Sequence, residues 1–158
     1  MVQAERVKNE PKRSELPVID ARTFLEHLPP DDCWDLLTGA EVGRIGVIVE
    51  GAPEIFPLNF VVDDRTIVFR TDSGNKLLGL LHNPAVCLEI DDVDLGAHSG
   101  WSVLVKGAVA EITDPEELRR AAELPLPLWS RGEKSHLMRI TPAQVTGRRL
   151  PRPTAAAR

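Results

Sequence analysis

The 158-residue sequence has few cysteines, no long apolar run and no apolar leader segment. The two cysteines, Cys33 and Cys87, lack metal-site spacing, and Cys87 lies in the apolar run VCLEI, where a small buried residue is expected. Such cysteine usage fits a reduced compartment, so we expect a cytoplasmic protein. No stretch approaches the ~18 apolar residues of a membrane span, and residues 1–15 do not resemble a signal peptide.

Positive charge is also in short supply. The formal net charge is −5 and the sequence pI is about 5.4, so nucleic acid would be repelled overall. A local anion site needs only two or three groups and stays possible. No Ser/His/Asp, Cys/His or paired-carboxylate arrangement stands out, and the histidines lack metal spacing. The sequence therefore predicts no metal site and no particular catalytic side chain, and redox chemistry would need a cofactor.

The remaining composition is that of one soluble domain, with 42% hydrophobic and 27% charged residues. Residues 1–16 are charged and lack periodicity, which predicts a flexible N-terminal arm. Residues 151–158 predict a flexible tail. The folded domain is expected to span residues 17–150.

Short helices are expected at the margins of this domain. Asp20 could cap a helix over 21–27, and Pro29-Pro30-Asp31 would start a second that ends near Gly39 and packs through Trp34. A third would follow Thr113, with Asp114 as N-cap, Pro115 as first residue and Glu117 as the reciprocal capping partner.

The rest of the domain is predicted to be β-structure. Residues 66–71 alternate with period two, Gly107 suggests a bulge or bend, and the acidic segment 91–94 reads as a solvated turn. One helix is expected between the strands, after residue 73, and one late in the chain. These elements favour an antiparallel barrel with small helices at its margins. The expected strands are 42–49, 54–62, 66–71, 85–90, 100–112 and 137–140, the last continued by 144–149.

The strand 66–71 delivers Arg70 and Thr71 to the start of a helix that carries Ser73 and Lys76. Free N–H groups at a helix start, two hydroxyls and two cations could together hold a phosphate. The alternative is that Ser73 merely caps the helix while Arg70 and Lys76 lie in water. The segment is not a Walker loop, because the spacing from Gly74 to the lysine is wrong.

Two further positions are unusual for strands. Pro57 suggests an edge, a bulge or a bend, and Asn59 interrupts an apolar run. Asn59 could satisfy a backbone group or bind a ring heteroatom of a ligand. Trp101, beside a glycine at a strand start, could lie over a flat ring or simply pack.

Four segments resemble the pyridoxamine 5′-phosphate oxidase-like flavin-binding split-barrel family. They are GRIGV at 43–47, PEIFPLNFVVDDRTIVFRTDSGNKL at 53–77, GWSVLVKGAVAEI at 100–112 and RITPAQVTGRRL at 139–150. The resemblance implies a mainly β (α+β) fold, a six-stranded antiparallel split β-barrel with short flanking helices. It also implies a homodimer with FMN at the subunit interface, acting on a small molecule as an oxidoreductase. Related barrels use a deazaflavin coenzyme or bind haem, and these stay alternatives.

The resemblance also assigns residues. Pro57, Leu58, Asn59 and Phe60 would flank the flavin ring; Phe69, Arg70 and Thr71 would follow the ring and ribityl chain; Ser73, Gly74 and Lys76 would hold the phosphate. Trp101 would come from the second subunit, with Trp129 and Arg139 nearby. Asn75-Lys76 replaces the Arg-Lys pair of the vitamin-processing oxidases, and only Arg148 and Arg149 are candidates for their substrate-phosphate residues. Oxidation of pyridoxamine phosphate is therefore not expected.

Overall fold

The computed structural model describes residues 18–127 and 135–152, apart from the side chains of Asn75 and Lys76. The predicted arm 1–16 lies outside the described residues, as does the tail beyond residue 152. The elements are β1 Val18–Ile19, β2 Glu26–Leu28, α1 Pro30–Gly39, β3 Val42–Val49, β4 Ala52–Asp63, β5 Thr66–Thr71, α2 Asn75–His82, β6 Ala85–Asp94, β7 Ser99–Glu111, α3 Pro115–Ala122 and β8 His136–Leu150.

Six of the strands close into an antiparallel barrel. The sheet runs in the order β1-β2-β8-β5-β4-β3-β6-β7, and β7 pairs with β8 again, so that β3 to β8 form a ring. Closure removes the unpaired edges that an open sheet would expose. The predicted mainly β fold, a six-stranded split barrel with short helices, is confirmed.

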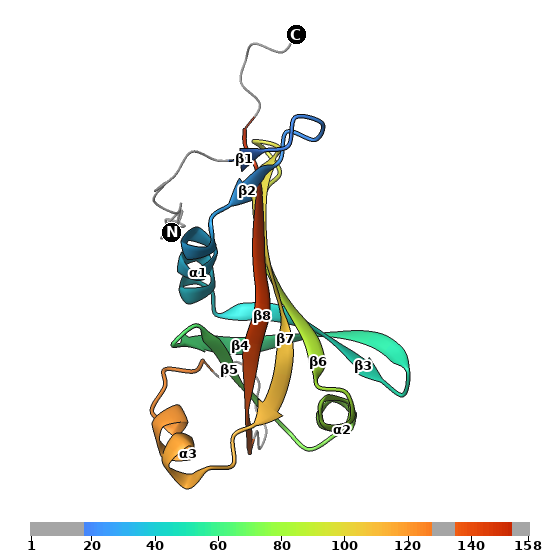
Figure 1. The fold of residues 1–158 in the computed structure, drawn as a ribbon, viewed down its shortest axis with the longest axis vertical. Coiled ribbons are helices and arrows are strands. Elements are labelled where there is room, and N and C mark those ends of the chain that lie inside the picture. Colours follow the sequence, from blue (N-terminus) through green and yellow to red (C-terminus); the bar gives the residue numbers. More distant parts are fainter. Residues whose placement is uncertain (1–17, 128–134, 153–158) are drawn as a thin grey trace, which may run out of the picture.

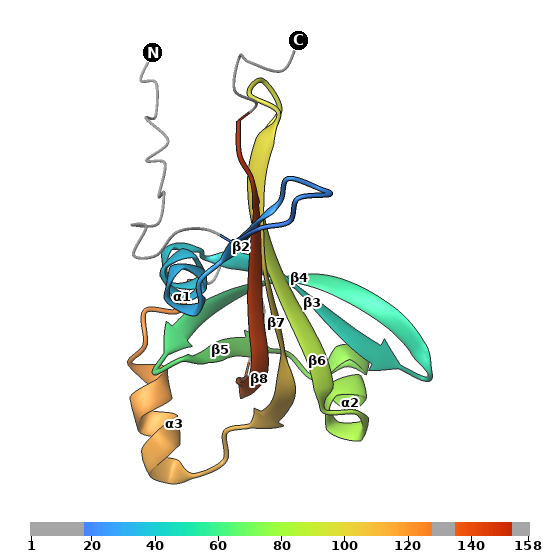
Figure 2. The same ribbon diagram turned by 45° about the horizontal axis from the view of Figure 1, so that its top comes forward.

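Three strands, β6, β7 and β8, extend well beyond the barrel. β7 and β8 pair along almost their whole length, and Figures 1 and 2 show them with β6 as a tall ribbon above the barrel. At the far end, β2 pairs with Gly147–Arg149 of β8, and β1 pairs with β2. We call this end, made of β1, β2 and the adjoining parts of β6, β7 and β8, the ribbon tip.

The barrel interior is one apolar core. Phe60 and Phe69 face each other from β4 and β5 and are fully buried, and α2 adds Leu77 and Leu80. Trp34 of α1 packs against this core, as predicted. Gly79 lets α2 approach β3 closely, since a Cβ there would stand 2.8 Å from a methyl carbon of Val49.

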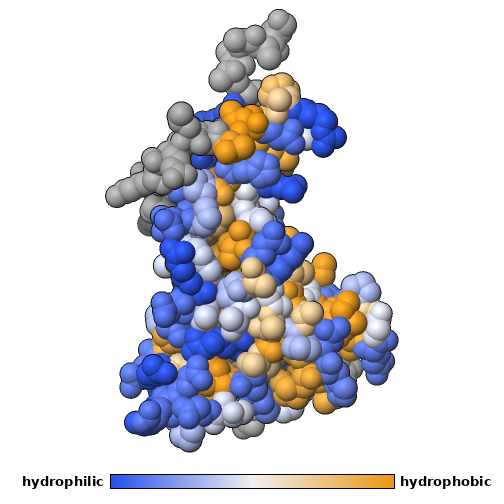
Figure 3. Space-filling model, viewed as in Figure 1, coloured by the Kyte–Doolittle hydropathy of each residue, from blue (hydrophilic) through white to orange (hydrophobic). Residues whose placement is uncertain are grey.

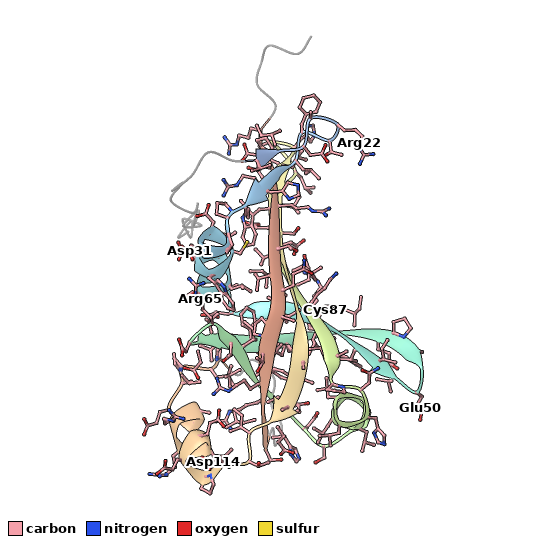
Figure 4. The ribbon with its side chains drawn as sticks, in the orientation of Figure 1. Arg22, Asp31, Glu50, Arg65, Cys87 and Asp114 are labelled. Atoms are coloured by element: carbon pink, nitrogen blue, oxygen red, sulfur yellow. The ribbon has the colours of Figure 1, made fainter. Side chains whose placement is uncertain are left out.

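A smaller core lies under α3, outside the barrel wall. Val68, Ile112, Ala121 and Leu137 form it, so β5 is buried on both faces at Val68. Asp114, labelled in Figure 4, caps α3 as predicted and accepts hydrogen bonds from the N–H groups of Glu116 and Glu117.

The helix expected over 21–27 is wrong. The Asp20 carboxylate accepts from the N–H groups of Arg22 and Thr23, but the chain then turns back, with Phe24 at φ 57°, into the β1–β2 hairpin. An aspartate can start a turn as readily as a helix. Residues 26–28 form a strand because they pair with Gly147–Arg149 at the edge of β8.

The turn expected at 91–94 is also wrong. β6 continues to Asp94 because β7 pairs with each of these residues, from Asp91 opposite Ser102 to Asp94 opposite Ser99. Arg44 binds the Asp91 carboxylate at 2.8 Å, which offsets the crowded negative charge. The chain reverses one residue later, at 95–98.

The last strand is unbroken where a break was expected. Gly107 lies opposite Pro142, whereas Lys106 lies opposite Gln144, so Ala143 is an extra residue in β8. This bulge accommodates Pro142, which has no N–H to donate. The predicted irregularity at Gly107 is confirmed, and a Cβ there would stand 2.3 Å from the Thr141 carbonyl oxygen.

Candidate cofactor site

The β3–β4 hairpin presents one face to the barrel core and the other outward. Pairing places Val42 opposite Asn59, Arg44 opposite Pro57 and Gly46 opposite Ile55, all on the outward face. The inward face carries the alternate residues, among which Leu58 is buried. Two candidate ring-binding residues, Pro57 and Asn59, therefore share an outward surface.

That outward face is largely apolar and uncovered in the single chain. Ile55 is 72% exposed, and Val42 and Ile48 are partly exposed beside it. Leu78 and Leu81 of α2 are exposed as well. Figure 3 shows apolar residues gathered over the lower right of the molecule, where the β3–β4 hairpin, β6 and α2 lie. A planar apolar ring or a second subunit would find complementary surface here.

Asn59 already binds a backbone group. Its side-chain N–H donates to the Glu41 carbonyl oxygen at 3.2 Å, and the backbone N–H of Phe60 donates to the same oxygen. Of the two alternatives for Asn59, backbone satisfaction is therefore realised. The side-chain carbonyl oxygen is held toward one side by this bond, which fixes the amide orientation for any ligand above the hairpin.

Four of the candidate residues have side chains inside the barrel. Leu58, Phe60, Phe69 and Thr71 are all buried, and Thr71 is fully so. A cofactor on the outside of the wall could meet only their backbone groups. The alternation along β4 and β5 decides this, because neighbouring residues point to opposite faces.

The proposed phosphate-binding segment is more open. Arg70 is half-buried and forms no salt bridge with any residue that the structure describes. Ser73 and Gly74 are exposed, and a Cβ on Gly74 would meet nothing within 4 Å. α2 then begins at Asn75. The Lys76 side chain lies outside the described part, so its assignment stays a prediction.

Ser73 belongs to a polar cluster that the sequence analysis did not identify. Its Oγ lies 3.1 Å from Nε2 of His136, whose Nδ1 lies 2.7 Å from the Glu111 carboxylate. The three residues are far apart in the chain, and strand pairing alone brings them together. In the sequence, the only feature that could have indicated this cluster is the position of two polar residues, His136 and Glu111, at the ends of apolar strands.

Trp101 lies far from this segment. Trp101 pairs with Arg149 of β8, whereas Thr71 pairs with His136 of the same strand. His136 and Arg149 are thirteen residues apart, a path of roughly 40 Å along β8 at about 3.3 Å per residue. Trp101 is nearer to the β3–β4 hairpin, because β6 pairs with both β3 and β7 and places Asp92, the partner of Trp101, three residues from Glu89, the partner of Arg44. The assignment of Trp101 to a wall supplied by a second subunit stays a prediction.

The remaining candidate residues divide between structural contacts and undescribed positions. Arg139 binds Asp63 and Glu117, at 2.8 and 3.2 Å, and joins α3 to the barrel. Arg148 and Arg149 lie at the ribbon tip, where Arg149 stands 3.9 Å from the buried Glu26. Trp129 lies outside the described residues.

Two groups have raised pKa values, the buried thiol of Cys33 and the exposed guanidinium of Arg44. Burial raises the pKa of the Cys33 thiol to about 11, with the neighbouring Asp32 adding to the effect. The hydrogen bonds that the Arg44 guanidinium donates to Asp91 and then to Glu89 raise the pKa of Arg44 on the outer face. Cys87 lies half-buried on β6 (Figure 4), rather than fully buried as expected.

Within residues 18–127 and 135–152, no three His, Cys, Asp or Glu side chains form a metal-binding group.

A family model described as pyridoxamine 5′-phosphate oxidase matches residues 29–149, most of the barrel and ribbon. The chain belongs to this family. An uncharacterised protein of Mycobacterium tuberculosis is 33% identical over 135 residues, which cover 82% of this chain and 88% of that protein. The helices of the described segments do not include one long and apolar enough to cross a membrane.

Solved structures of flavin-binding relatives share the fold. An FAD-binding protein from Mycobacterium smegmatis is 40% identical with a TM-score of 0.67, covering 78% of this chain and 96% of that one. An FAD-binding protein from Mesorhizobium loti is 26% identical with a TM-score of 0.69, covering 80% and 99%. Two relatives that bind FAD, one at 40% and one at 26% identity, therefore share the fold of this chain.

Proposed function

We propose that this protein is a homodimeric flavoprotein that binds FMN and acts as an oxidoreductase on a small molecule. The observation that carries the proposal is the continuous outer surface from the β3–β4 hairpin to the start of α2. Phe60 of β4 pairs with Phe69 of β5, and their side chains are buried. Asn59 and Arg70 are the next residues of these two strands, so their side chains point to the opposite, outer face. Pro57 and Asn59 thus lie on the path toward Ser73.

The residues present fit a flavin phosphate ester. The ring would lie against the apolar hairpin face near Pro57 and Asn59, since planar aromatic surfaces bind such faces. The phosphate would lie by Arg70, Ser73, Gly74 and Lys76, where a half-buried arginine has no salt bridge within the described part and Gly74 leaves space. Phe69 and Thr71 would contribute backbone groups alone, because their side chains are buried.

A bound flavin would supply two-electron redox chemistry, which this chain's side chains lack. The protein would orient the ring with the Asn59 amide, which Glu41 holds in place. It would also exclude water with the apolar residues Val42 and Ile55 of the hairpin. Each of these roles is binding or positioning, so no single side chain is assigned to catalysis.

The dimer is proposed because one chain holds only one wall of the site. Trp101 lies on β7, two strands away from Arg44 of the hairpin, and would face the flavin of the second copy, as the resemblance implies. Exposed apolar residues on the hairpin and on α2, among them Ile55 and Leu81, would be covered by the second copy.

The experiment is cofactor identification followed by affinity measurement. Purified protein is denatured and the released cofactor is identified by mass spectrometry, which separates FMN from FAD, from a deazaflavin and from haem. We expect FMN; the FAD-binding relatives make FAD the main competitor. Protein that is colourless, and whose fluorescence and absorption do not respond to added FMN or FAD, would overturn the flavin assignment.

Turnover is a separate measurement. Loaded protein is mixed with NAD(P)H or with a reduced deazaflavin, and bleaching of the flavin band near ~450 nm is followed, a region that the flavin chromophore supplies. Bleaching supports an oxidoreductase. A bound flavin that neither donor reduces favours a non-catalytic carrier.

A further inference from the structure

The polar cluster of Ser73, Glu111 and His136 closes the end of the barrel beside the start of α2. His136 pairs with Thr71, and Glu111 pairs with Met138. The last layer of side chains inside the barrel is therefore polar, whereas the layers before it, which contain Met138, are apolar. The imidazole joins a carboxylate at 2.7 Å to a hydroxyl at 3.1 Å. His136 and Glu111 are each about one-third exposed or less, at 27% and 31%.

We propose that His136 is a ligand of the flavin's terminal phosphate and that Glu111 holds its ring in position. This proposal rests on the proposed function. Glu111 accepts from Nδ1–H and thereby points Nε2 toward Ser73, which the phosphate segment presents. When both ring nitrogens carry protons, Nε2–H donates to a phosphate oxygen, and the Glu111 carboxylate balances the imidazolium charge.

The surroundings favour an anion over a neutral ligand. Arg70, three residues before Ser73, has no salt bridge with a described residue, and Gly74 leaves open space beside the hydroxyl. A phosphate at Ser73 would meet the Ser73 hydroxyl and the His136 ring, with the Arg70 cation on the neighbouring position across the end of β5.

The order Ser73–His136–Glu111 is also that of a hydrolase triad. A hydrolase would use Ser73 as a nucleophile on a neutral ester, a ligand with no need for the cation at Arg70. Covalent labelling of Ser73 by a fluorophosphonate that FMN does not block would therefore contradict the phosphate assignment.

The decisive comparison is between FMN and riboflavin, which lacks the phosphate. We expect His136→Gln to weaken FMN binding roughly 10- to 100-fold, the effect of a lost charge-assisted hydrogen bond. Riboflavin binding should change less than about twofold. Both affinities are measured by quenching of flavin fluorescence. A merely structural histidine would lower both affinities together or neither.

Glu111→Gln tests the positioning role. The amide keeps an acceptor oxygen but loses the charge, so FMN affinity should fall less than in His136→Gln, again with riboflavin unaffected. His82→Gln is the matched control, because His82 lies at the other end of α2 and contacts the Leu78 carbonyl oxygen. It should leave both affinities unchanged.

The outcomes separate the inference from the proposed function. Flavin binding with an unchanged FMN-to-riboflavin ratio in His136→Gln overturns the inference and leaves the flavin site standing. If no flavin binds, inorganic phosphate is titrated against the NMR signals of the His136 ring in the full chain. A saturable shift, absent in Arg70→Gln, supports the anion site without a flavin; no shift overturns both.

Discussion

The barrel and the ribbon tip bury their apolar side chains in different ways. In the barrel, α2 closes the end and α3 covers the wall, so Phe60, Phe69 and Ile140 are fully buried in the single chain. At the ribbon tip, Phe24 is 69% exposed and Leu95 is 81% exposed, with Val18, Ile19, Val93 and Leu150 also exposed nearby. The barrel buries its core within one chain, whereas the ribbon tip leaves its large apolar side chains uncovered, as a protein–protein interface would.

The same contrast separates the two walls of the proposed flavin site. The barrel supplies a built wall, with Asn59 and Ser73 held by Glu41 and His136. The ribbon carries Trp101, which packs against the barrel core but lies far along β8 from the Ser73 end of that wall. In the proposed dimer, cofactor binding would depend on association, while folding of the barrel would not.

The largest loss of stability is expected inside the barrel, from Gly107→Ala. The new Cβ would stand 2.3 Å from the Thr141 carbonyl oxygen, and backbone must move to relieve the clash. We expect the free energy of unfolding to fall by about 3 kcal/mol. Chemical denaturation measures it.

The matched control is Gly96→Ala at the ribbon tip, where the new Cβ would meet only the Asp94 carboxylate at 3.5 Å. It should change the unfolding free energy by less than about 0.5 kcal/mol. Equal losses in both variants would show that the barrel is not the more tightly packed region.

The attachment of α3 to the barrel comes next. Arg139→Leu would leave the partly buried Asp63 and Glu117 carboxylates without their shared cation, at a cost of about 2 kcal/mol. Arg119→Leu, which removes an exposed pair with Glu116 at 3.7 Å, is the control and should cost less than about 0.5 kcal/mol. Thermal unfolding of both variants checks this; indistinguishable melting temperatures would refute a clamping role for Arg139.

A smaller effect should appear at high pH through Cys33. Its thiol pKa is raised in the folded state from 9.0 to about 11, so the unfolded chain loses the proton first. Stability is therefore fully present below pH 9 and falls as the pH rises toward 11, by up to about 2 kcal/mol. Cys33→Ala should remove that part of the pH dependence, while Cys87→Ala should retain it. Parallel pH profiles for wild type and Cys33→Ala would contradict the assignment.

The least change in folding stability is expected from Leu95→Asp at the ribbon tip, because that side chain is already exposed. Unfolding at low protein concentration should shift by less than about 0.5 kcal/mol. The proposed dimer should weaken at least tenfold, because a buried, unpaired charge opposes association. Sedimentation equilibrium measures it, with Thr113→Asp beside α3 as the control. A dimer that survives Leu95→Asp unchanged would place the interface elsewhere.

Local sequence patterns predicted much of the fold because they depend on near neighbours. The alternation at 66–71, the cap at Asp114 and the irregularity at Gly107 all appear in the structure. The failures came where a distant strand decided the outcome. Asp20 capped a turn because β8 offers its edge to β2, and Asp91–Asp94 joined β6 because β7 extends beside them.

The sequence by itself determined the six barrel strands and the position of the segment from Arg70 to Gly74, since periodicity, glycine and proline placement and family motifs are all local. Tertiary structure alone decided which side chains are available. It buried Phe60, Phe69 and Thr71, engaged Arg139 with α3, and set Trp101 far from Ser73. It also assembled His136, Glu111 and Ser73, because barrel closure joins strand ends that no local pattern relates.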